Sequence, residues 1–238
     1  MDKCCSLLEL GLVEYGEAFH LQRAIAAARE KGVLPDTLIT LEHPPVLTLG
    51  RRANRANIVV SEELLRSEGI AVYQSTRGGD VTYHGPGQLV GYPILGLRQL
   101  GMGASLYVHT LELVIIDLLH GFGIEARQDP RHVGVWVRDE KVAAIGVAIS
   151  GGITTHGFAL NVNPNLSHFG LINPCGITDR GVTSLARLLG RTVQVSEVRP
   201  LLTQSFSRLF GLEMVSCRPA DLAAAAVFGP TDSTAFLP

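Results

Sequence analysis

A glycine-rich segment, RGGDVTYHGPGQLVGY at residues 77–92, constrains the fold of this chain more than any other stretch. Glycine at this density lets the backbone approach a ligand closely, because no Cβ stands in the way. Within the segment, Arg77 is a permanent cation with five donors, and His84 can carry or accept a proton near neutral pH. The apolar run that begins at Gln88 is typical of a strand. The residues fit a binding loop that leads into a rigid element, and they equally fit a glycine-rich hairpin with a solvated arginine.

The composition is that of a globular protein with a sizeable core. The chain has 238 residues, of which 46% are hydrophobic and 18% charged, and its net charge of -2 does not indicate a nucleic-acid partner. No apolar run is long enough to span a membrane, and the N-terminal apolar stretch is too short for a signal peptide. Four cysteines without a CxxC spacing fit a reducing compartment. We therefore expect a cytoplasmic protein without nucleic-acid or membrane partners.

The hydrophobic pattern predicts strands that come in runs and do not alternate strictly with helices. This order favours an α+β fold, with a mixed or largely antiparallel sheet flanked by helices. We expect a single catalytic domain over residues 1–238, with a core at about 10–217 and a loosely held tail at 218–238. The predicted helices cover residues 20–31, 105–120 and 197–210, the last capped by Ser196, with short helices capped by Ser61 and Thr183; the predicted strands cover residues 37–42, 46–49, 71–76, 133–137, 142–149, 153–162 and 212–216.

Two residues outside the glycine-rich segment are candidates for chemistry. Cys175 is bracketed by Pro174 and Gly176 in a loop, which fits a nucleophile better than a buried core position. Lys141 stands next to turn residues at the start of an apolar strand. It is by default a solvated turn lysine, but a lysine drawn toward apolar surroundings can act as a base or stabilise a thiolate as a cation.

The histidines leave both a structural and a functional interpretation open. His84 and His156 each fit a hydrogen-bonded core or turn position, and each could instead orient a substrate or move a proton. No pair of histidines has metal-ligand spacing, so no metal site is expected. No GxxxxGK[ST] run is present either, which excludes a Walker-type nucleotide site.

Five blocks of the chain, taken together and in order, resemble the octanoyltransferase family (lipoyl/octanoyl transferases). The likeness covers roughly Tyr15 to Leu189 and continues more weakly to about Phe210. By resemblance the fold is α+β and related to the biotin and lipoate ligase catalytic module, which agrees with the fold class predicted from the pattern. The blocks are TLGRRA, RGGDVTYHGPGQLVGYPI, EKVAAIGV, THGFALNVNPNL and NPCGITDRGVTSL.

The resemblance also implies site residues. The family uses a Cys/Lys pair, and the matching positions here are Cys175 and Lys141. Asp80 falls at a position that looks variable in the family, so its side chain is given no role. The implied substrate-binding residues form three short segments: Arg77, Gly78, Gly79, Asp80, Val81, Thr82, Tyr83 and His84; Ala144, Ile145 and Gly146; and Gly157, Phe158 and Ala159.

The reaction implied by the resemblance is transfer of an octanoyl group from acyl carrier protein, through a Cys175 thioester, to a lysine of a lipoyl domain. This is the first step of protein lipoylation and lipoate biosynthesis. The implied acceptors are the lipoyl domains of 2-oxo-acid dehydrogenase complexes and the glycine cleavage H protein. The octanoyl group arrives on the phosphopantetheine of the carrier as a thioester. The route from thioester to amide is downhill, so no ATP, metal or other cofactor is expected.

Three other classes of function remain open from the residues. A lipoate or biotin ligase would activate a free acid with ATP and would not need Cys175. A non-catalytic acyl-binding protein would survive Cys175→Ala without loss. A cysteine hydrolase would release free octanoate with water. The basic cluster of Arg51, Arg52 and Arg55 could dock an acidic carrier protein, or it could be a solvated edge.

Overall fold

The main sheet is mixed, as the sequence pattern predicts. The computed structural model describes residues 4–173 and 180–221. The strands of this sheet are β1 (Cys4–Leu12), β2 (Asp36–Glu42), β6 (Gln88–Ile94), β7 (Arg127–Gln128), β8 (Val135–Val137), β9 (Glu140–Ser150), β10 (Ile153–Asn161), β11 (Gly181–Val182) and β12 (Glu213–Cys217). Their order is β12-β1-β2-β6-β10-β9-β8-β7, and β11 lies beside the start of β9. The pairs from β2 to β7 are antiparallel, whereas β1 runs parallel to both β2 and β12.

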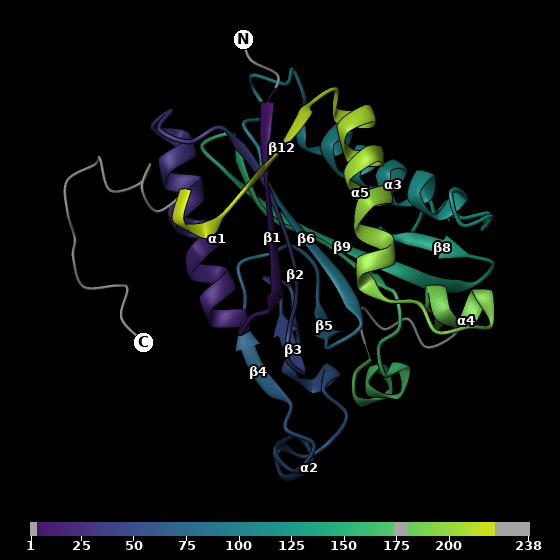
Figure 1. Ribbon diagram of the computed structural model, residues 1–238. Helices are drawn as coiled ribbons and strands as arrows, with labels where there is room; N and C mark the ends of the chain where they lie inside the picture. Colours follow the sequence, from purple (N-terminus) through teal and green to yellow (C-terminus); the bar gives the residue numbers. More distant parts are fainter. Residues whose placement is uncertain (1–3, 174–179, 222–238) are drawn as a thin grey trace.

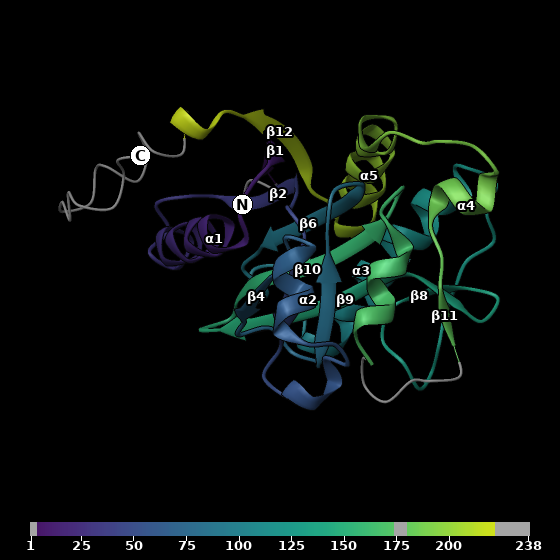
Figure 2. The same ribbon diagram turned by 90° about the horizontal axis from the view of Figure 1, so that it is seen from below.

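Three long helices cover the two faces of this sheet. Helix α1 (Tyr15–Glu30) lies on one face, and α3 (Ala104–His120) and α5 (Val195–Phe210) lie on the other (Figures 1 and 2). Successive strand residues point to opposite faces, so Leu38 packs under α3 and α5 while Ile39 packs under α1. The prediction of a sheet flanked by helices is therefore confirmed, with a separate apolar core on each face.

A second, smaller sheet lies below the main one in Figure 1. It consists of β3 (Val46–Leu49), β4 (Ala71–Gln74) and β5 (Val81–His84) in the order β4-β3-β5. Helix α2 (Glu62–Ser67) and two 3-10 turns, η1 (Arg55–Asn57) and η2 (Leu166–Leu171), adjoin it. Leu47, Val81 and Tyr83 form its core together with Leu65 and Ile172. The predicted glycine-rich loop thus contains strand β5 and leads into β6, which links the two sheets.

Several elements differ from the sequence prediction, among them the short strands β5, β7 and β11, which were not predicted. Strand β1 was not predicted, because its apolar run becomes a strand only through parallel pairing with β2 and β12, which are distant in sequence. Helix α1 begins at Tyr15 and not at His20. The predicted limits of one domain, a core at 10–217 and a tail at 218–238, stay a prediction, and residues 222–238 lie outside the described part.

The helix caps follow the prediction at one of three positions. Ser61 caps α2, since its side chain accepts a hydrogen bond from the Leu64 backbone N–H. The cap of α4 (Leu185–Leu189) is Ser184 and not Thr183. The cap of α5 is Gln194 and not Ser196, because a capping box between Gln194 and Glu197 satisfies the first turn. Both errors are displacements of one or two residues among neighbouring polar side chains.

Helix α3 supplies a test of the core. Leu118 is fully buried in the core beneath α3 and α5, whereas Leu106 on the same helix is 51% exposed. Leu118→Ala should lower the free energy of unfolding by about 2–5 kcal/mol, because it leaves a cavity. Leu106→Ala should change it by less than about 0.5 kcal/mol. Urea denaturation of the two variants measures the difference, and equal effects would contradict the assigned core.

Candidate active site

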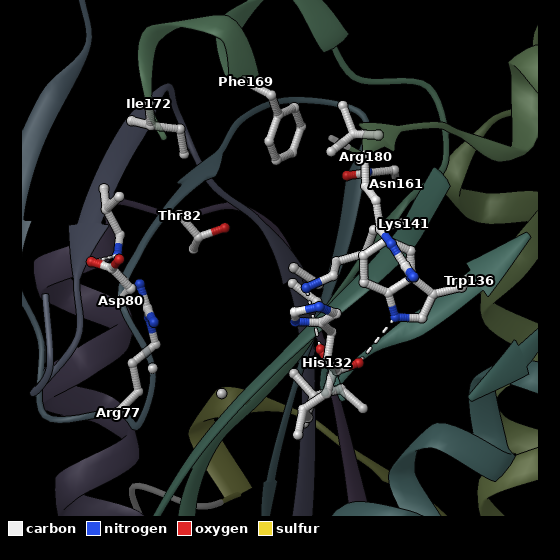
Figure 3. Close-up of a pocket in the computed structure, with 18 of the residues that line it drawn as sticks. Arg77, Asp80, Thr82, His132, Trp136, Lys141, Asn161, Phe169, Ile172 and Arg180 are labelled. Carbon is white, nitrogen blue, oxygen red and sulfur yellow. Dashed lines mark hydrogen bonds between the residues drawn. The ribbon is translucent and has the colours of Figure 1, made fainter. Parts of the chain in front are cut away.

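A large cavity lies between the two sheets (Figure 3). Its volume is about 800 Å³. The loop Arg77–Thr82 forms one wall, and residues 144–147 of β9 form another. Phe169 and Ile172 line a third side, and Lys141, Trp136 and Arg180 gather at the end opposite Arg77 and Asp80. The cavity is therefore a slot with a polar loop on one side, apolar strand residues on the other and cationic side chains at one end.

A second cavity, of about 50 Å³, adjoins the large one. The two share wall residues from three elements: Arg77 and Thr82, Ala144–Gly146 of β9, and Ala159 of β10. The additional residues of the small cavity are Tyr15, His84, Tyr92, His156, Gly157 and Phe158. The acyl-binding segments implied by the resemblance therefore meet around one continuous hollow. Every residue of that set lines one of the two cavities except Tyr83.

Two residues of the set make hydrogen bonds that support the walls: Tyr83, which does not line either cavity, and Asp80, which does. The hydroxyl of Tyr83 lies 2.7 Å from Nδ1 of His168, and its ring packs in the core of the small sheet because side chains alternate along β5. Asp80 is buried, and its carboxylate accepts hydrogen bonds from the backbone N–H of Val81 at 2.7 Å and from the Asn57 amide at 2.5 Å. Asp80 thus braces the loop, consistent with the absence of a predicted role in binding.

Arg77 is buried and joins the loop to both sheets. Its guanidinium donates to the carbonyl and the hydroxyl of Thr48 on β3, at 2.5 and 3.0 Å, and to the carbonyl of Gly78 at 3.1 Å. On the other side it lies against Gly146 of β9, where an added Cβ would come within 3.1 Å of Arg77 Cδ. The backbone N–H of Gly78 also donates to the Val147 carbonyl at 2.9 Å. These contacts hold the loop as a wall of the cavity.

Two buried histidines, His84 and His156, line the small cavity, and a third, His43, lies behind them with its ring centre 5.7 Å from that of His84. His84 lies 3.0 Å from Gln88 Oε1 through Nδ1, and His43 lies 2.7 Å from the Tyr92 hydroxyl through Nε2. His156 has φ 57°, uncommon for a residue other than glycine, and its Nε2 lies 2.9 Å from the Thr76 hydroxyl. Burial lowers the pKa of His43 and of His156 to about 4, and it lowers the pKa of His84 well below its usual range. These rings are therefore neutral at pH 7.

Lys141 is held between strands at the cationic end. Its backbone pairs with Trp136 on β8 and with Val182 on β11. Its Nζ donates to the Val133 carbonyl at 3.2 Å and lies 4.9 Å from the centre of the Trp136 ring. Gly134 has φ 130°, and a Cβ there would meet Lys141 Cε at 3.2 Å. Lys141 therefore lies inward along the cavity wall, in contrast to the default interpretation of a solvated turn lysine.

The predicted nucleophile, Cys175, lies outside the described residues, which exclude 174–179. Ile172, which lies just before the last described residue on one side, and Arg180, the first described residue on the other, both line the large cavity. Among its described lining residues the cavity has five lysine or arginine side chains and one carboxylate, Asp80. The five are Arg52, Arg77, Arg131, Lys141 and Arg180.

Sequence reasoning did not identify Trp136, Arg180 or Asp129 as part of this end of the cavity. The Arg180 guanidinium carbon lies 5.1 Å from the centre of the Trp136 ring, and its Nη1 donates to Asp129 at 2.6 Å. Trp136 is the chain's single tryptophan, in a strand that was predicted, but periodicity does not say what its ring contacts. Contacts between elements that are far apart in sequence leave no pattern in the sequence around each residue.

Within residues 4–173 and 180–221, no helix is both long and apolar enough to cross a bilayer. The same part of the chain contains no group of three or more His, Cys, Asp and Glu side chains arranged to hold a metal ion.

Comparison with known proteins places the chain in a family. Residues 14–207 match the lipoyl protein ligase A/B catalytic domain. An octanoyltransferase of Caldicellulosiruptor bescii is 49% identical over 210 residues, which cover 87% of this chain and 92% of the relative.

Two solved structures share the fold at low sequence identity. A bipartite lipoate protein ligase of Thermoplasma acidophilum superposes with a TM-score of 0.73 at 18% identity, covering 96% of this chain and 91% of the other. The biotin protein ligase of Aquifex aeolicus gives a TM-score of 0.51 at 16% identity, covering 88% and 71%. At these identities the likeness concerns the fold alone.

The fold is thus that of the catalytic module of lipoate and biotin protein ligases. Within that class, the chain belongs to the octanoyltransferase family and is an enzyme of the transferase type.

The buried histidines predict a loss of stability in acid. Because the pKa of His156 is about 4 in the folded protein and about 6.5 when unfolded, the unfolded chain binds more protons between these values. Each such histidine should therefore contribute stability above pH 6.5 that is lost at about 1.4 kcal/mol per pH unit as the pH falls toward 4.

His156→Asn tests this, since asparagine tolerates the positive φ of the position. Urea denaturation between pH 7 and 4.5 should show a shallower pH dependence than that of the unsubstituted protein. The exposed His20 provides the matched control, and His20→Asn should leave the slope unchanged. An unchanged slope in His156→Asn would contradict a neutral, buried His156.

Proposed function

We propose that this member of the octanoyltransferase family moves an octanoyl group from the phosphopantetheine of acyl carrier protein to a lysine of a lipoyl domain, by way of a thioester on Cys175. The observation that carries the proposal is the slot between the two sheets. Its walls are the loop Arg77–Thr82 and residues 144–147 of β9, and it ends at Lys141. Such a slot suits a short acyl chain with its reacting carbonyl at the cationic end.

Chain connectivity supports Cys175 as the nucleophile. It is three residues from Ile172, and three residues span at most about 11 Å even when fully extended. Ile172 lines the cavity, and so does Arg180 on the other side of the segment. Cations near a thiol favour its thiolate form, which is the reactive nucleophile.

The chemistry follows in two balanced steps. The Cys175 thiolate attacks the carrier's thioester carbonyl, the bond to the pantetheine sulfur breaks, and that sulfur leaves as a thiol after taking a proton from Lys141. The acceptor lysine then attacks the new thioester as a neutral amine. Cys175 leaves as the thiolate, and Lys141 takes the proton that the amine loses. The amide product is more stable than the thioester, so ATP is not consumed.

The apolar part of the wall supplies binding energy for the acyl chain. Ile145, Val147, Phe169 and Ile172 line the cavity. Burying about seven carbons at about 0.8 kcal/mol each contributes at most about 5–6 kcal/mol. The acyl chain also keeps water away from the thioester, which favours transfer to the acceptor lysine over hydrolysis.

A second candidate function, ATP-dependent ligation of a free acid, is favoured by one observation. Among the described residues, the cavity lining has five cations and one carboxylate, which suits an anionic ligand such as a nucleotide. The structural relative from Aquifex aeolicus is described with biotin and ATP. In a transferase, the same cations would bind the phosphodiester of the carrier's phosphopantetheine and stabilise a thiolate at Cys175.

Intact-protein mass spectrometry distinguishes the candidates. Mixed with octanoyl-carrier in the absence of ATP, the protein should gain one octanoyl group, and a lipoyl domain should discharge it. Cys175→Ala should show no adduct, whereas Cys217→Ala, a half-buried cysteine on β12, should acylate normally. Lys141→Met should slow acylation by about 10²–10⁴-fold, the range for a general acid or base.

Three other results would each support a different function. Modification of the acceptor only with ATP and free octanoate would establish the ligase. Rapid release of octanoate without an acceptor would establish a hydrolase. Carrier binding without any adduct would leave a non-catalytic acyl-binding protein.

We propose that the carrier docks on Arg51 and Arg52, of which Arg52 lines the slot. The backbone N–H groups of Arg51 and Arg52 donate to the carbonyls of Arg77 and Gly79, and both side chains are exposed. Neither makes an ion pair within the described residues, whereas Arg55, the third member of the cluster, pairs with Glu62 at 2.6 Å. The two side chains thus remain available to an acidic protein surface.

Arg51→Glu/Arg52→Glu should raise the KM for octanoyl-carrier by about 10-fold at low salt, because a rim charge acts on encounter with the partner. The effect should shrink at about 0.5 M salt, where the Debye length is short. Arg98→Glu is the matched control, since Arg98 is exposed and does not line the cavity. An unchanged KM in the double variant would remove this docking site.

A further inference from the structure

Asp129 is a buried carboxylate behind the cationic end of the cavity. Its side chain is 3% exposed. Oδ1 accepts hydrogen bonds from the backbone N–H groups of Arg131 at 2.9 Å and His132 at 3.1 Å, and Oδ2 accepts from Arg180 Nη1 at 2.6 Å. The Arg180 guanidinium and these N–H groups hold the pKa of Asp129 well below its usual range. The carboxylate therefore ties the loop 129–133 to the residue that precedes β11.

The loop that Asp129 braces presents two carbonyl groups to the site. The His132 carbonyl accepts a hydrogen bond from Trp136 Nε1 at 3.1 Å, drawn as a dashed line in Figure 3. The next carbonyl, of Val133, accepts from Lys141 Nζ at 3.2 Å. A shift of this loop would therefore move both the indole ring and the ammonium group.

The indole ring of Trp136 also contacts both Lys141 and Arg180. Lys141 Nζ lies 4.9 Å from the ring centre, and the guanidinium carbon of Arg180 lies 5.1 Å from it. Both distances are within the range of a cation–π interaction, and the ring belongs to a residue that is 1% exposed, whereas Lys141 itself is half-buried. Figure 3 shows Lys141, Trp136 and Arg180 grouped at one end of the cavity. Asp129 contacts one cation directly and the other through the loop and the ring.

We propose that Asp129 is a positioning residue for acyl transfer, which fixes Lys141 and Arg180 on Trp136 at the reacting end of the cavity. The proposal rests on the proposed function in one respect, the role of Lys141 in the chemistry. The arrangement that Asp129 maintains is independent of that role, and it can be measured without turnover.

Asp129→Asn keeps the size of the side chain and removes its charge. The loop and Arg180 should then relax, and Lys141 Nζ should lose its fixed position. The kcat for octanoyl transfer should fall by about 10- to 100-fold, the effect of a misplacement of about 1 Å. The KM for octanoyl-carrier should change less than kcat, because the proposed acyl-binding walls, residues 77–82 and 144–147, lie outside the loop 129–133.

Asp36 provides a matched control. It is similarly buried, with a side chain 7% exposed, and it pairs with Arg29 at 2.6 Å. It also accepts a hydrogen bond from a backbone N–H, that of Gly96, at 2.8 Å. None of these three residues lines either cavity. Asp36→Asn should therefore lower stability to a comparable degree and leave kcat unchanged at temperatures where the variant is folded.

The single tryptophan gives a readout that does not require activity. Because Trp136 is the only tryptophan, its emission and its quenching by iodide report on the ring that Lys141 and Arg180 contact. Asp129→Asn should shift the emission maximum and increase quenching, whereas Asp36→Asn should do neither. In a Lys141→Met background, Asp129→Asn should cause little further loss of kcat, because the two residues act through one group.

The possible outcomes separate the proposal from the proposed function. Unchanged emission and unchanged kcat in Asp129→Asn would overturn the proposal. An equal loss of kcat in Asp129→Asn and Asp36→Asn, in step with stability, would also overturn it, since Asp129 would then be merely structural. Full activity of Lys141→Met would refute the role of Lys141 in the proposed function, and the emission of Asp129→Asn would still decide whether Asp129 holds the cluster.

Discussion

The rest of the site depends on the contacts that the buried guanidinium of Arg77 makes with both sheets. It donates to Thr48 of the small sheet and lies against Gly146 of the main sheet, so one cation joins the two sheets at the wall of the slot. A side chain larger than hydrogen at Gly146 would push it away. Burial lowers the pKa of His84 and of His156, and the Arg77 charge lowers both further, so that the two rings are neutral. Arg77 thus shapes the large cavity and favours neutral histidines around the small cavity.

The sequence predicted which helices and strands form better than it predicted which strands pair with one another. The apolar runs of β9 and β10 and the helical spacing of apolar residues in α3 were sufficient to predict these three elements. Strand β1 was missed, since its pairing with β2 and β12 is not local. The caps at Thr183 and Ser196 were wrong by one or two residues because adjacent polar side chains compete for the same backbone donors.

The sequence likewise predicted which segments of the chain form the site but not the contacts between them. The three segments that the family resemblance predicts to bind the acyl chain do converge on one hollow, except for Tyr83, which packs in the core of the small sheet. Cys175 lies outside the described residues, so its role stays a prediction. The surroundings of Lys141 had no sequence signal at all. Asp129, Trp136 and Arg180 meet there because β8, β11 and the loop 129–133 come together in space, which one sequence does not reveal.

The central claim is that the acyl chain lies in the slot with its carbonyl at the cationic end. A crystal structure of the protein after reaction with octanoyl-carrier tests it most directly. The account predicts density for the octanoyl chain between the loop Arg77–Thr82 and residues 144–147, joined to Cys175 Sγ, with its carbonyl within hydrogen-bonding reach of Lys141. An acyl chain bound elsewhere, or a Lys141 ammonium turned away from that carbonyl, would contradict it.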